Sequence, residues 1–181
     1  YEAGYFGERI QGTDFGCDIV IYRGAGSYVC GEASALITSI EGKKGYPRNR
    51  PPRLTVRGLY QRPTVINNVE TLSNVAVIVG QGAEAFRKVG TAKSPGTQLV
   101  SISGHVQRPG VYEVEYGTPL AKFIFEDCGG VLGGGKLKCI VPGGISTKVL
   151  TAAEIATVTY DHASLSAAGS GVGSGGMVVI G

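Results

Sequence analysis

A glycine-rich loop between an apolar run and a helical pattern constrains the fold of this chain more than any other feature. The loop covers residues 23–32, and the apolar run 18–22 before it predicts a strand. The apolar spacing over 33–40 predicts a helix directly after the loop. A strand, a glycine loop and a helix in this order bring unshielded backbone N–H groups and a helix N-terminus to one point. That arrangement favours an anionic ligand such as a nucleotide phosphate, although the loop carries Glu32 where a cation is expected.

Two familiar nucleotide-binding patterns are excluded by their context. Gly26 and Gly31 have the spacing of a P-loop, but Glu32 and Ala33 stand where a P-loop has Lys and Ser or Thr. A second glycine cluster over 169–176 contains Gly-x-Gly-x-x-Gly, the dinucleotide fingerprint. This cluster precedes an apolar run instead of following a strand, so the physical reason for the fingerprint is missing. The sequence therefore predicts a nucleotide site of an unusual kind.

Composition and charge limit the classes of protein to be considered. The 181 residues, 43% of them hydrophobic, suffice for one ordinary domain or for one and a half small ones. The net charge of +3 is small and the basic residues are scattered outside 48–57, which argues against nucleic-acid binding. No apolar run approaches the roughly 20 residues of a membrane span and no signal peptide is visible, so we expect a soluble chain without membrane insertion. Both ends are abrupt, which we interpret as a piece of a longer polypeptide.

The cysteines and histidines do not form a recognisable metal or catalytic motif. The chain has four cysteines without a C-x-x-C pair or a nearby histidine, namely Cys17, Cys30, Cys128 and Cys139. We expect them to be reduced thiols of a cytosolic protein, with no metal or iron–sulfur site among them. His105 and His162 lie far apart without triad-like neighbours, so we expect structural roles for both.

The first half of the chain, residues 1–90, is predicted to form a first domain. A basic, proline-bearing connection over 42–58 cannot be helical throughout. Asn67 and Asn68 can cap a helix whose apolar spacing from Val69 onward runs to a break at 80–82 and continues to 89. Residues 91–97 are predicted to be a linker.

The second half predicts a small β-grasp unit over 97–147, with ferredoxin-like packing as the alternative. Strands are expected at 98–103, 111–116 and 137–141, with a turn at 108–110 and a helix at 119–127. Residues 148–181 are expected to return to the first domain, where the apolar run 177–180 would add a strand to its sheet. The predicted class is therefore α/β.

The polar residues of the first half carry no evident catalytic group. Taken alone, Glu32 is typical of a carboxylate in the first turn of a helix, and Asn67-Asn68 is typical of a cap or turn. Together they offer carboxylate and amide groups without a catalytic base or a nucleophile. Such a set suits a protein that holds a cofactor whose own chemistry carries the reaction.

Six motifs resemble the flavoprotein family of the respiratory complex I 51 kDa (F) subunit. They occur in the same order as in that family and lie at 23–32, 39–48, 63–72, 103–111, 141–147 and 165–171. The family includes the diaphorase subunits of NAD-linked formate dehydrogenases and of bidirectional hydrogenases. The resemblance implies a partial Rossmann-like domain for FMN and NADH, followed by a ubiquitin-like β-grasp domain of the soluble-ligand-binding (SLBB) type.

The resemblance also implies the site residues. The positions that match the family's FMN site are Gly24, Gly26, Tyr28, Gly31, Glu32, Ala33, Ile66, Asn67, Asn68 and Thr71. The positions that match its NAD site are Glu32, Ala33 and Arg53. The flavin would perform the chemistry, so no catalytic side chain is implied, and the family's 4Fe-4S cluster would have no ligands in this chain.

The implied function is an NADH dehydrogenase (quinone) flavoprotein subunit that passes electrons from NADH through FMN to iron–sulfur clusters. Its implied partners are NAD(H), a thioredoxin-like 2Fe-2S subunit and further subunits of a multi-subunit oxidoreductase. The implied location is the cytoplasm, or the cytoplasmic face of the inner membrane, or the matrix side in a eukaryote. Two alternatives stay open: a diaphorase subunit of an NAD(P)-linked formate dehydrogenase or hydrogenase, and a non-catalytic fragment that acts as a subunit-interaction scaffold.

The sequence departs from the family's pattern at the nucleotide site. Ala33 stands where the family has a second glutamate, and Arg53 stands where it has phenylalanine. Both changes make the pocket more positive, which suggests weaker NADH binding or a shift toward NADPH; neutral drift is the alternative. The family's upstream glycine loop and downstream cysteine cluster have no counterpart, so we expect a central fragment with about half of the flavin site.

Overall fold

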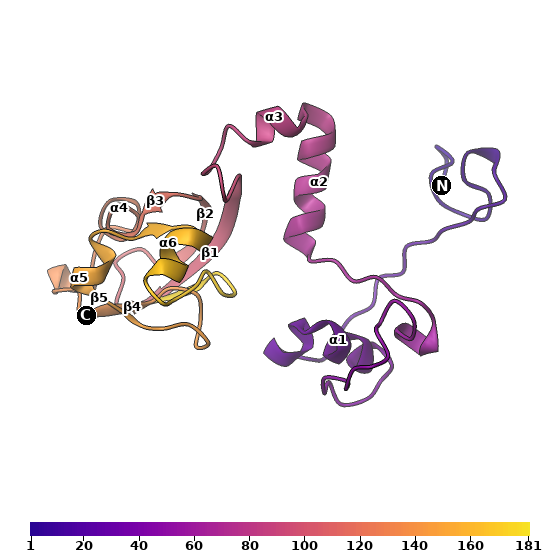
Figure 1. Ribbon diagram of the computed structural model, residues 1–181, viewed down its shortest axis with the longest axis horizontal. Helices are drawn as coiled ribbons and strands as arrows, with labels where there is room; N and C mark the ends of the chain where they lie inside the picture. Colours follow the sequence, from indigo (N-terminus) through magenta and orange to yellow (C-terminus); the bar gives the residue numbers. More distant parts are fainter. The chain divides into compact units, whose positions relative to one another are not determined.

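The computed structural model describes residues 1–181 as two units, Tyr1–Asn67 and Asn68–Gly181 (Figure 1). In the first unit, helix α1 (Ala33–Ile40) begins where the Glu32 carboxylate accepts hydrogen bonds from the N–H groups of Ser34 and Ala35. These bonds satisfy donors that a helix start otherwise leaves free. The other regular elements of this unit are 3-10 turns at Ile10–Gly12, Tyr28–Gly31 and Leu59–Gln61. The helix predicted at 33–40 is confirmed.

The strand predicted at 18–22 is not formed. These residues belong to no strand or bridge, and the Val20 and Ile21 side chains are 85% and 89% exposed. An apolar run forms a strand only when a neighbouring strand pairs with its backbone N–H and C=O groups. The first unit contains no strand that could do so; its one ladder contact is the isolated bridge between Gly7 and Cys17. The strand prediction was therefore wrong.

The second unit begins with a helix whose cap is visible in the sequence. Helix α2 (Val69–Gln81) starts at Asn68, whose side-chain oxygen accepts hydrogen bonds from Glu70 N–H at 2.8 Å and Thr71 N–H at 3.4 Å. It ends at Gly82, which has a φ of +87° and separates it from the short helix α3 (Ala83–Phe86). The predicted cap and break are confirmed, whereas the helix predicted to reach residue 89 ends at Phe86.

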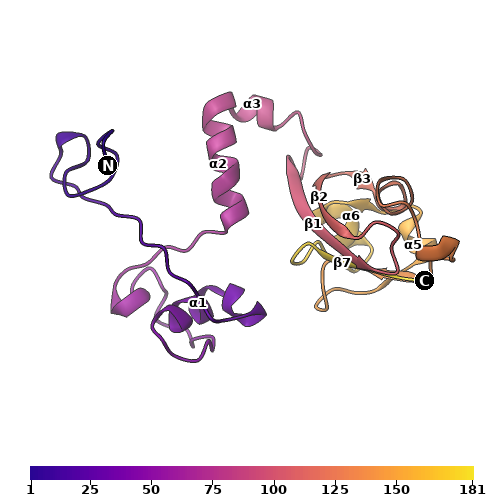
Figure 2. The ribbon, with the colours of Figure 1, turned by 180° about the vertical axis from the view of Figure 1, so that it is seen from behind.

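The second unit contains a mixed five-stranded sheet, in the order β2-β1-β7-β4-β5. Figure 2 labels its strands β1, β2 and β7. Its strands are β1 (Thr97–Gly104), β2 (Gly110–Glu115), β4 (Cys139–Val141), β5 (Leu150–Thr151) and β7 (Gly176–Ile180). Strand β1 pairs antiparallel with β2 and parallel with β7, and β4 pairs antiparallel with β7 and β5. A second, two-stranded sheet pairs β3 (Thr118–Pro119) with β6 (Thr159–Tyr160). The class is therefore α/β, as predicted.

The last strand lies in a different sheet from the one predicted. Residues 177–180 were expected to join the first domain, but β7 lies between β1 and β4 in the centre of the second unit's sheet. Its alternating side chains explain this position, since Met177 and Val179 are both buried in the core of that unit. The expected return to the first domain was wrong, and the β-grasp unit continues past residue 147.

The core of the second unit lies between the sheet and three short helices. Helix α4 (Leu120–Lys122) continues into a π-helical turn at Phe123–Asp127, and helices α5 (Ala152–Ile155) and α6 (His162–Ala167) follow. Leu120, Phe123 and Leu165 from these elements are fully buried against Val100 and Ile140 of the sheet. No helix of the chain is both long and apolar enough for a membrane crossing.

Candidate nucleotide site

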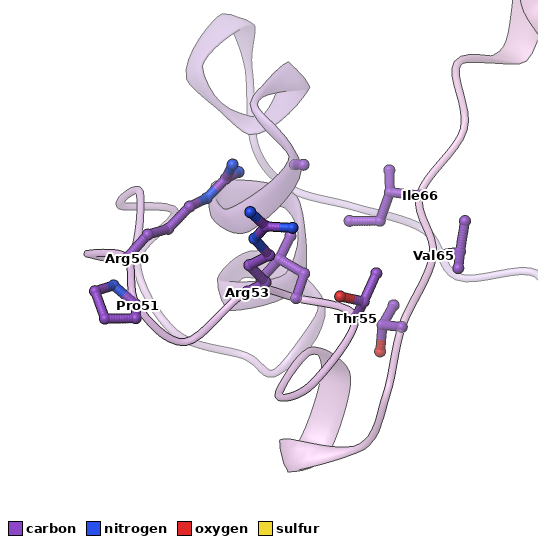
Figure 3. Close-up of a pocket in the computed structure, with 9 residues that line it drawn as sticks. Arg50, Pro51, Arg53, Thr55, Val65 and Ile66 are labelled. Carbon is purple, nitrogen blue, oxygen red and sulfur yellow. The ribbon is translucent and has the colours of Figure 1, made fainter.

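A pocket of about 650 Å³ lies in the first unit, beside the start of α1 (Figure 3). It is lined by residues from three segments: Ala33, Arg50, Pro51, Arg53, Leu54, Thr55, Thr64, Val65 and Ile66. Figure 3 shows that Arg50 and Arg53 extend from one loop to the same side, with Val65 and Ile66 across from them. The pocket therefore has one cationic wall and one apolar wall.

Glu32 lies next to this pocket and is held as an ionised cap of α1. One carboxylate oxygen accepts three hydrogen bonds, from Ser34 Oγ at 2.5 Å, Ala35 N–H at 2.8 Å and Ser34 N–H at 2.9 Å. The other oxygen lies 3.5 Å from the Arg50 guanidinium. The hydrogen bond from the Ser34 hydroxyl, followed by that from Ala35 N–H, lowers the pKa of Glu32 below its ordinary value. Since the side chain is 41% exposed, it also faces solvent as a hydrogen-bond acceptor.

A polar network joins α1 to the loop that carries the two pocket arginines. Arg48 N–H donates to Ser34 Oγ at 2.8 Å, and the Arg48 side chain donates to Thr38 Oγ1 at 3.0 Å and to the Gly58 carbonyl at 3.2 Å. The same guanidinium pairs with Glu41 at 2.9 Å. This network fixes the backbone on both sides of the pocket.

Glu41 is the buried charge at the centre of that network, with a side chain only 7% exposed. Burial acts to raise its pKa, but hydrogen bonds from the Arg48 side chain and from Tyr60 N–H outweigh burial, so the pKa of Glu41 is lowered. The carboxylate is therefore ionised and holds the 58–62 turn against α1. This interaction is structural and does not reach the pocket.

The glycines of the loop have two different roles. A Cβ atom on Gly24 or Gly31 would meet no atom within 4 Å, so these backbones face open space. A Cβ atom on Gly26 would lie 2.2 Å from Cys30 Sγ, and one on Gly45 would lie 2.5 Å from the same sulfur. Gly26 and Gly45 thus allow the Cys30 side chain to pack between them, whereas Gly24 and Gly31 leave room for a ligand to approach the backbone.

The structure brings some of the predicted site residues together and leaves others apart. Ala33, Arg53 and Ile66 line the pocket, and Glu32 caps the helix beside it. Gly26 instead lines a separate hollow of about 570 Å³ with Arg23, Lys43, Lys44 and others, and Tyr28 is 69% exposed. Asn67 is an exposed residue at the end of the first unit, and Asn68 and Thr71 belong to the second unit.

Sequence reasoning missed part of the pocket wall. The lining residues that were not predicted are Arg50, Pro51, Leu54, Thr55, Thr64 and Val65. Arg50 could have been found, because Glu32 needs a counterion and the densest basic stretch of the chain is 48–57. The other five carry no chemical signal that distinguishes them from ordinary loop residues.

A hollow of about 500 Å³ in the second unit is lined by two carboxylates, Glu70 and Glu113, and by no cation. The buried Gln98 accepts hydrogen bonds from the hydroxyls of Tyr116 and Tyr160, whose rings stack at 6.2 Å. His105 accepts a hydrogen bond from Gly181 N–H, and His162 packs on the Tyr116 ring. No group of three or more His, Cys, Asp or Glu side chains could hold a metal ion. These polar contacts stabilise the fold and leave the nucleotide pocket as the candidate site.

Comparison with known proteins agrees with the division of the chain into two units. The family model of the Nuo51 FMN-binding domain matches residues 3–77, and that of the SLBB domain matches residues 98–180. The chain belongs to the family of the complex I 51 kDa subunit. The predicted order of the family's domains is confirmed, and the SLBB match extends to β7, in agreement with the sheet.

Curated relatives of this chain are named as F subunits of NADH-quinone oxidoreductase. An F subunit of NADH-quinone oxidoreductase from Rhizobium meliloti, the one numbered 2, is 48% identical over 180 residues, which are 99% of this chain and 42% of that protein. The F subunit of the same enzyme from Mycobacterium tuberculosis (strain H37Rv) is 47% identical over 174 residues, 96% of this chain and 39% of the relative. The chain thus spans less than half the length of these relatives.

A solved structure shows a similar fold. A chain of the NAD⁺-reducing [NiFe]-hydrogenase, in its H₂-reduced state, superimposes with a TM-score of 0.73 at 40% identity. The superposition covers 87% of this chain and 26% of the hydrogenase chain. By their names, the curated relatives and this hydrogenase are oxidoreductases that use NADH or NAD⁺.

Proposed function

We propose that this chain forms part of a flavoprotein subunit in which NADH is oxidised on FMN and the electrons pass to iron–sulfur clusters. One observation carries the proposal. The segment that matches the FMN-binding model contains a pocket that joins Ala33, Arg53 and Ile66 beside the helix capped by Glu32. Three of the positions predicted from the sequence thus line one cavity.

The residues present fit a nucleotide cofactor. The pocket volume lies within the roughly 300–1,000 Å³ of ordinary ligand sites. Arg50 and Arg53 suit phosphate groups, since a guanidinium donates paired hydrogen bonds to phosphate oxygens. No atom lies within 4 Å of a Cβ position on Gly24 or Gly31, so a ligand can approach these backbone segments closely. FMN, when bound, would accept a hydride from NADH and release the electrons one at a time.

The chain's own residues would bind and orient the two nucleotides. The residues that would hold FMN are Gly24, Gly26, Tyr28, Gly31, Glu32, Ala33, Ile66, Asn67, Asn68 and Thr71, and those that would contact the dinucleotide are Glu32, Ala33 and Arg53. Asn68 already uses its side-chain oxygen to cap α2, so its amide N–H₂ is the group left for a phosphate. Ionised Glu32 would accept hydrogen bonds from donors of the bound nucleotides. The pocket lining contains neither a histidine nor a carboxylate, so its residues would bind and orient the nucleotides.

The wider setting of this activity is also proposed. The relatives' names describe subunits of multi-subunit enzymes, and a thioredoxin-like 2Fe-2S subunit would be the immediate partner. The 4Fe-4S cluster of the family would be bound by residues outside this chain. The protein would act in the cytoplasm or at the cytoplasmic face of the inner membrane.

The structural match to the hydrogenase chain favours a second candidate, a diaphorase subunit of an NAD(P)-linked hydrogenase or formate dehydrogenase. The two candidates share the pocket and differ in the terminal acceptor. Purification of the intact complex, with identification of its quinone, hydrogen or formate activity, would decide between them.

The experiment that tests the proposal uses the full-length protein that contains this segment. Reconstitution with FMN, followed by anaerobic addition of NADH, should bleach the flavin absorbance. Glu32→Gln should raise the Kd for FMN about tenfold, because it removes a charge-assisted acceptor. Glu2→Gln, an exposed carboxylate with no side-chain partner, serves as the matched control. Absence of FMN uptake by the wild type would support the scaffold alternative instead.

A further inference from the structure

Helix α2 belongs to both halves of the chain. The model of the FMN-binding domain matches residues 3–77 and so includes most of α2, whereas the structure groups α2 with the second unit, from Asn68 onward. Its N-terminal end carries Asn68 and Thr71, two of the positions proposed to hold FMN. The attachment of α2 to the sheet of the second unit therefore bears on how these two residues are held.

Apolar packing does not hold α2 in place. None of its residues is buried, and Val69 and Val79 near its two ends are 78% and 79% exposed. No residue of α2 belongs to the core of the second unit. A hollow of about 500 Å³ lies between its first two turns and the strands β1 and β2. The position of the helix on the sheet therefore depends on polar contacts.

A single side-chain contact joins α2 to the sheet. Glu70 Oε1 accepts a hydrogen bond from Leu99 N–H of β1 at 2.9 Å, across 29 residues of sequence. The other side-chain hydrogen bonds of α2 are those of Asn68 and Ser73, and both residues bond to the backbone of α2 itself. No residue of α2 takes part in an ion pair. The Glu70 carboxylate is thus the tether of the helix.

The Leu99 N–H group is free for this tether because β1 begins before its neighbour β7. Strand β7 pairs with β1 from Ser101 onward, and Ser101 N–H donates to the Gly175 carbonyl. Since N–H groups two residues apart in a strand point to the same side, Leu99 N–H faces the side on which β7 has not yet begun. A strand N–H group without a neighbouring strand needs another acceptor. The Glu70 carboxylate supplies it, and a charged acceptor makes the stronger kind of hydrogen bond.

We infer that Glu70 is a positioning residue of the flavin site, which holds Asn68 and Thr71 in place for FMN by anchoring the first turn of α2 to β1. The inference rests on the proposed function and adds a residue that itself touches no cofactor. It also gives the β-grasp unit a task in cofactor binding, because its sheet is the support to which the helix is tied. Loss of the tether weakens FMN binding without removing any group that contacts FMN.

The test uses the full-length protein that contains this segment, with Glu70 changed in two ways. Glu70→Asp keeps the charge but is a methylene group too short to reach Leu99 N–H. Glu70→Gln keeps the length and a carbonyl acceptor but has no charge. Titration of the apoprotein with FMN, followed by flavin fluorescence, gives the Kd. Glu70→Asp should raise the Kd about tenfold, the effect of one lost charge-assisted hydrogen bond, and Glu70→Gln should raise it less than about threefold.

Glu113→Gln is the matched control. Glu113 lines the same hollow, but its carboxylate accepts a hydrogen bond from the Thr97 hydroxyl and none from α2. This variant should leave the Kd for FMN unchanged. Equal losses of affinity in Glu113→Gln and Glu70→Asp would show that the charge of the hollow matters and not the tether, and would overturn the inference.

Hydrogen exchange of the Leu99 amide is a second readout, which reports on the tether and not on the flavin contacts. Addition of FMN to the wild type should slow this exchange, because two events that favour the same helix position stabilise each other reciprocally. In Glu70→Asp the addition of FMN should leave it unchanged. If Glu70→Asp fails to fold, which loss of protection at the Val100 and Ile140 amides would reveal, the wild-type measurement decides: absence of slowing by FMN contradicts the inference.

The remaining outcomes separate this inference from the proposed function. A wild-type Kd in Glu70→Asp, or weaker FMN binding by Glu70→Gln than by Glu70→Asp, would point to the charge at the helix start and refute the tether. The proposed function would survive that result as long as NADH bleaches the bound flavin. If the wild-type protein binds no FMN, the proposed function fails and the inference fails with it.

Discussion

The two units of this chain are held together by different physical means. The second unit has eighteen buried hydrophobic residues in one continuous core, whereas the first unit buries Ala35 and Ile37 alone among its hydrophobic residues. The first unit relies on the Glu32 cap, the Arg48–Glu41 pair and the packing of Cys30 between glycines. The candidate site is therefore built on a polar network, and the β-grasp unit on apolar burial.

This difference separates the tasks of the two units. Apolar burial is non-directional and gives the second unit most of its stability. Hydrogen bonds and ion pairs are directional, so the first unit's network can position charged groups around a nucleotide. Substitutions should therefore affect global stability in the second unit and site geometry in the first.

The largest effect should come from the core of the second unit. Phe123 is 1% exposed and packs edge-on against Tyr112 at 5.6 Å between ring centroids. Phe123→Ala should lower the free energy of unfolding by about 3–5 kcal/mol, since it removes buried apolar contacts and leaves a cavity. Phe125, two residues on and 48% exposed, gives the matched control Phe125→Ala.

Urea titration followed by circular dichroism measures both variants of this phenylalanine pair. The control should change the free energy of unfolding by less than about 1 kcal/mol. Equal losses for the two variants would contradict the claim that one continuous core stabilises this unit.

A smaller effect on stability should come from the Arg48–Glu41 network of the first unit. Glu41→Gln leaves Arg48 without its ionised partner and weakens the bond to Tyr60 N–H. Hydrogen exchange of the Tyr60 amide should show a local opening free energy smaller by about 1–2 kcal/mol, while the second unit's amides keep their protection.

Glu84→Gln is the matched control for the Glu41 substitution. It removes an ion pair with Arg87 in which both side chains are at least 70% exposed. It should change the exchange of neighbouring amides by less than about 0.5 kcal/mol. Faster exchange throughout the second unit of Glu41→Gln would show that the two units are not stabilised separately.

The elements that sequence reasoning found are those with local causes. Helices α1 and α2 were predicted because Glu32 and Asn68 cap them within three residues and the apolar spacing follows directly. The hairpin of β1 and β2 was predicted for the same reason, since its alternation and turn lie within twenty residues.

The elements that sequence reasoning misplaced depend on distant partners. The run 18–22 has strand-like composition but no neighbouring strand, and β7 pairs with strands about 40 and 75 residues away along the chain, which periodicity cannot reveal. The Arg48–Glu41 pair was missed because an ion pair across a loop leaves no pattern in the sequence. In the site, Ala33, Arg53 and Ile66 were named from the resemblance and not from periodicity, and their roles stay a prediction.

The smallest effect concerns a surface cap of the second unit, where charge supplements the apolar core. Glu154 closes a capping box with Thr151 at the start of α5 and accepts a hydrogen bond from Lys148 Nζ at 2.8 Å. The Lys148 bond, followed by those from Thr151, lowers the pKa of Glu154 from 4.5 to about 2. A carboxylate with a lowered pKa in the folded state stabilises the fold above its unfolded pKa, and this stabilisation is lost as the pH falls toward 2.

Glu154→Gln should therefore remove part of the acid sensitivity of the second unit between about pH 4.5 and 2. Urea midpoints measured across this range should fall less steeply in the variant than in the wild type. Lys148→Met should reduce the slope by less, because the Thr151 bonds remain. Identical slopes of urea midpoint against pH for all three proteins would show that this exposed cap adds no stability beyond that of the apolar core. The second unit would then be stabilised by apolar burial without an electrostatic contribution from this cap.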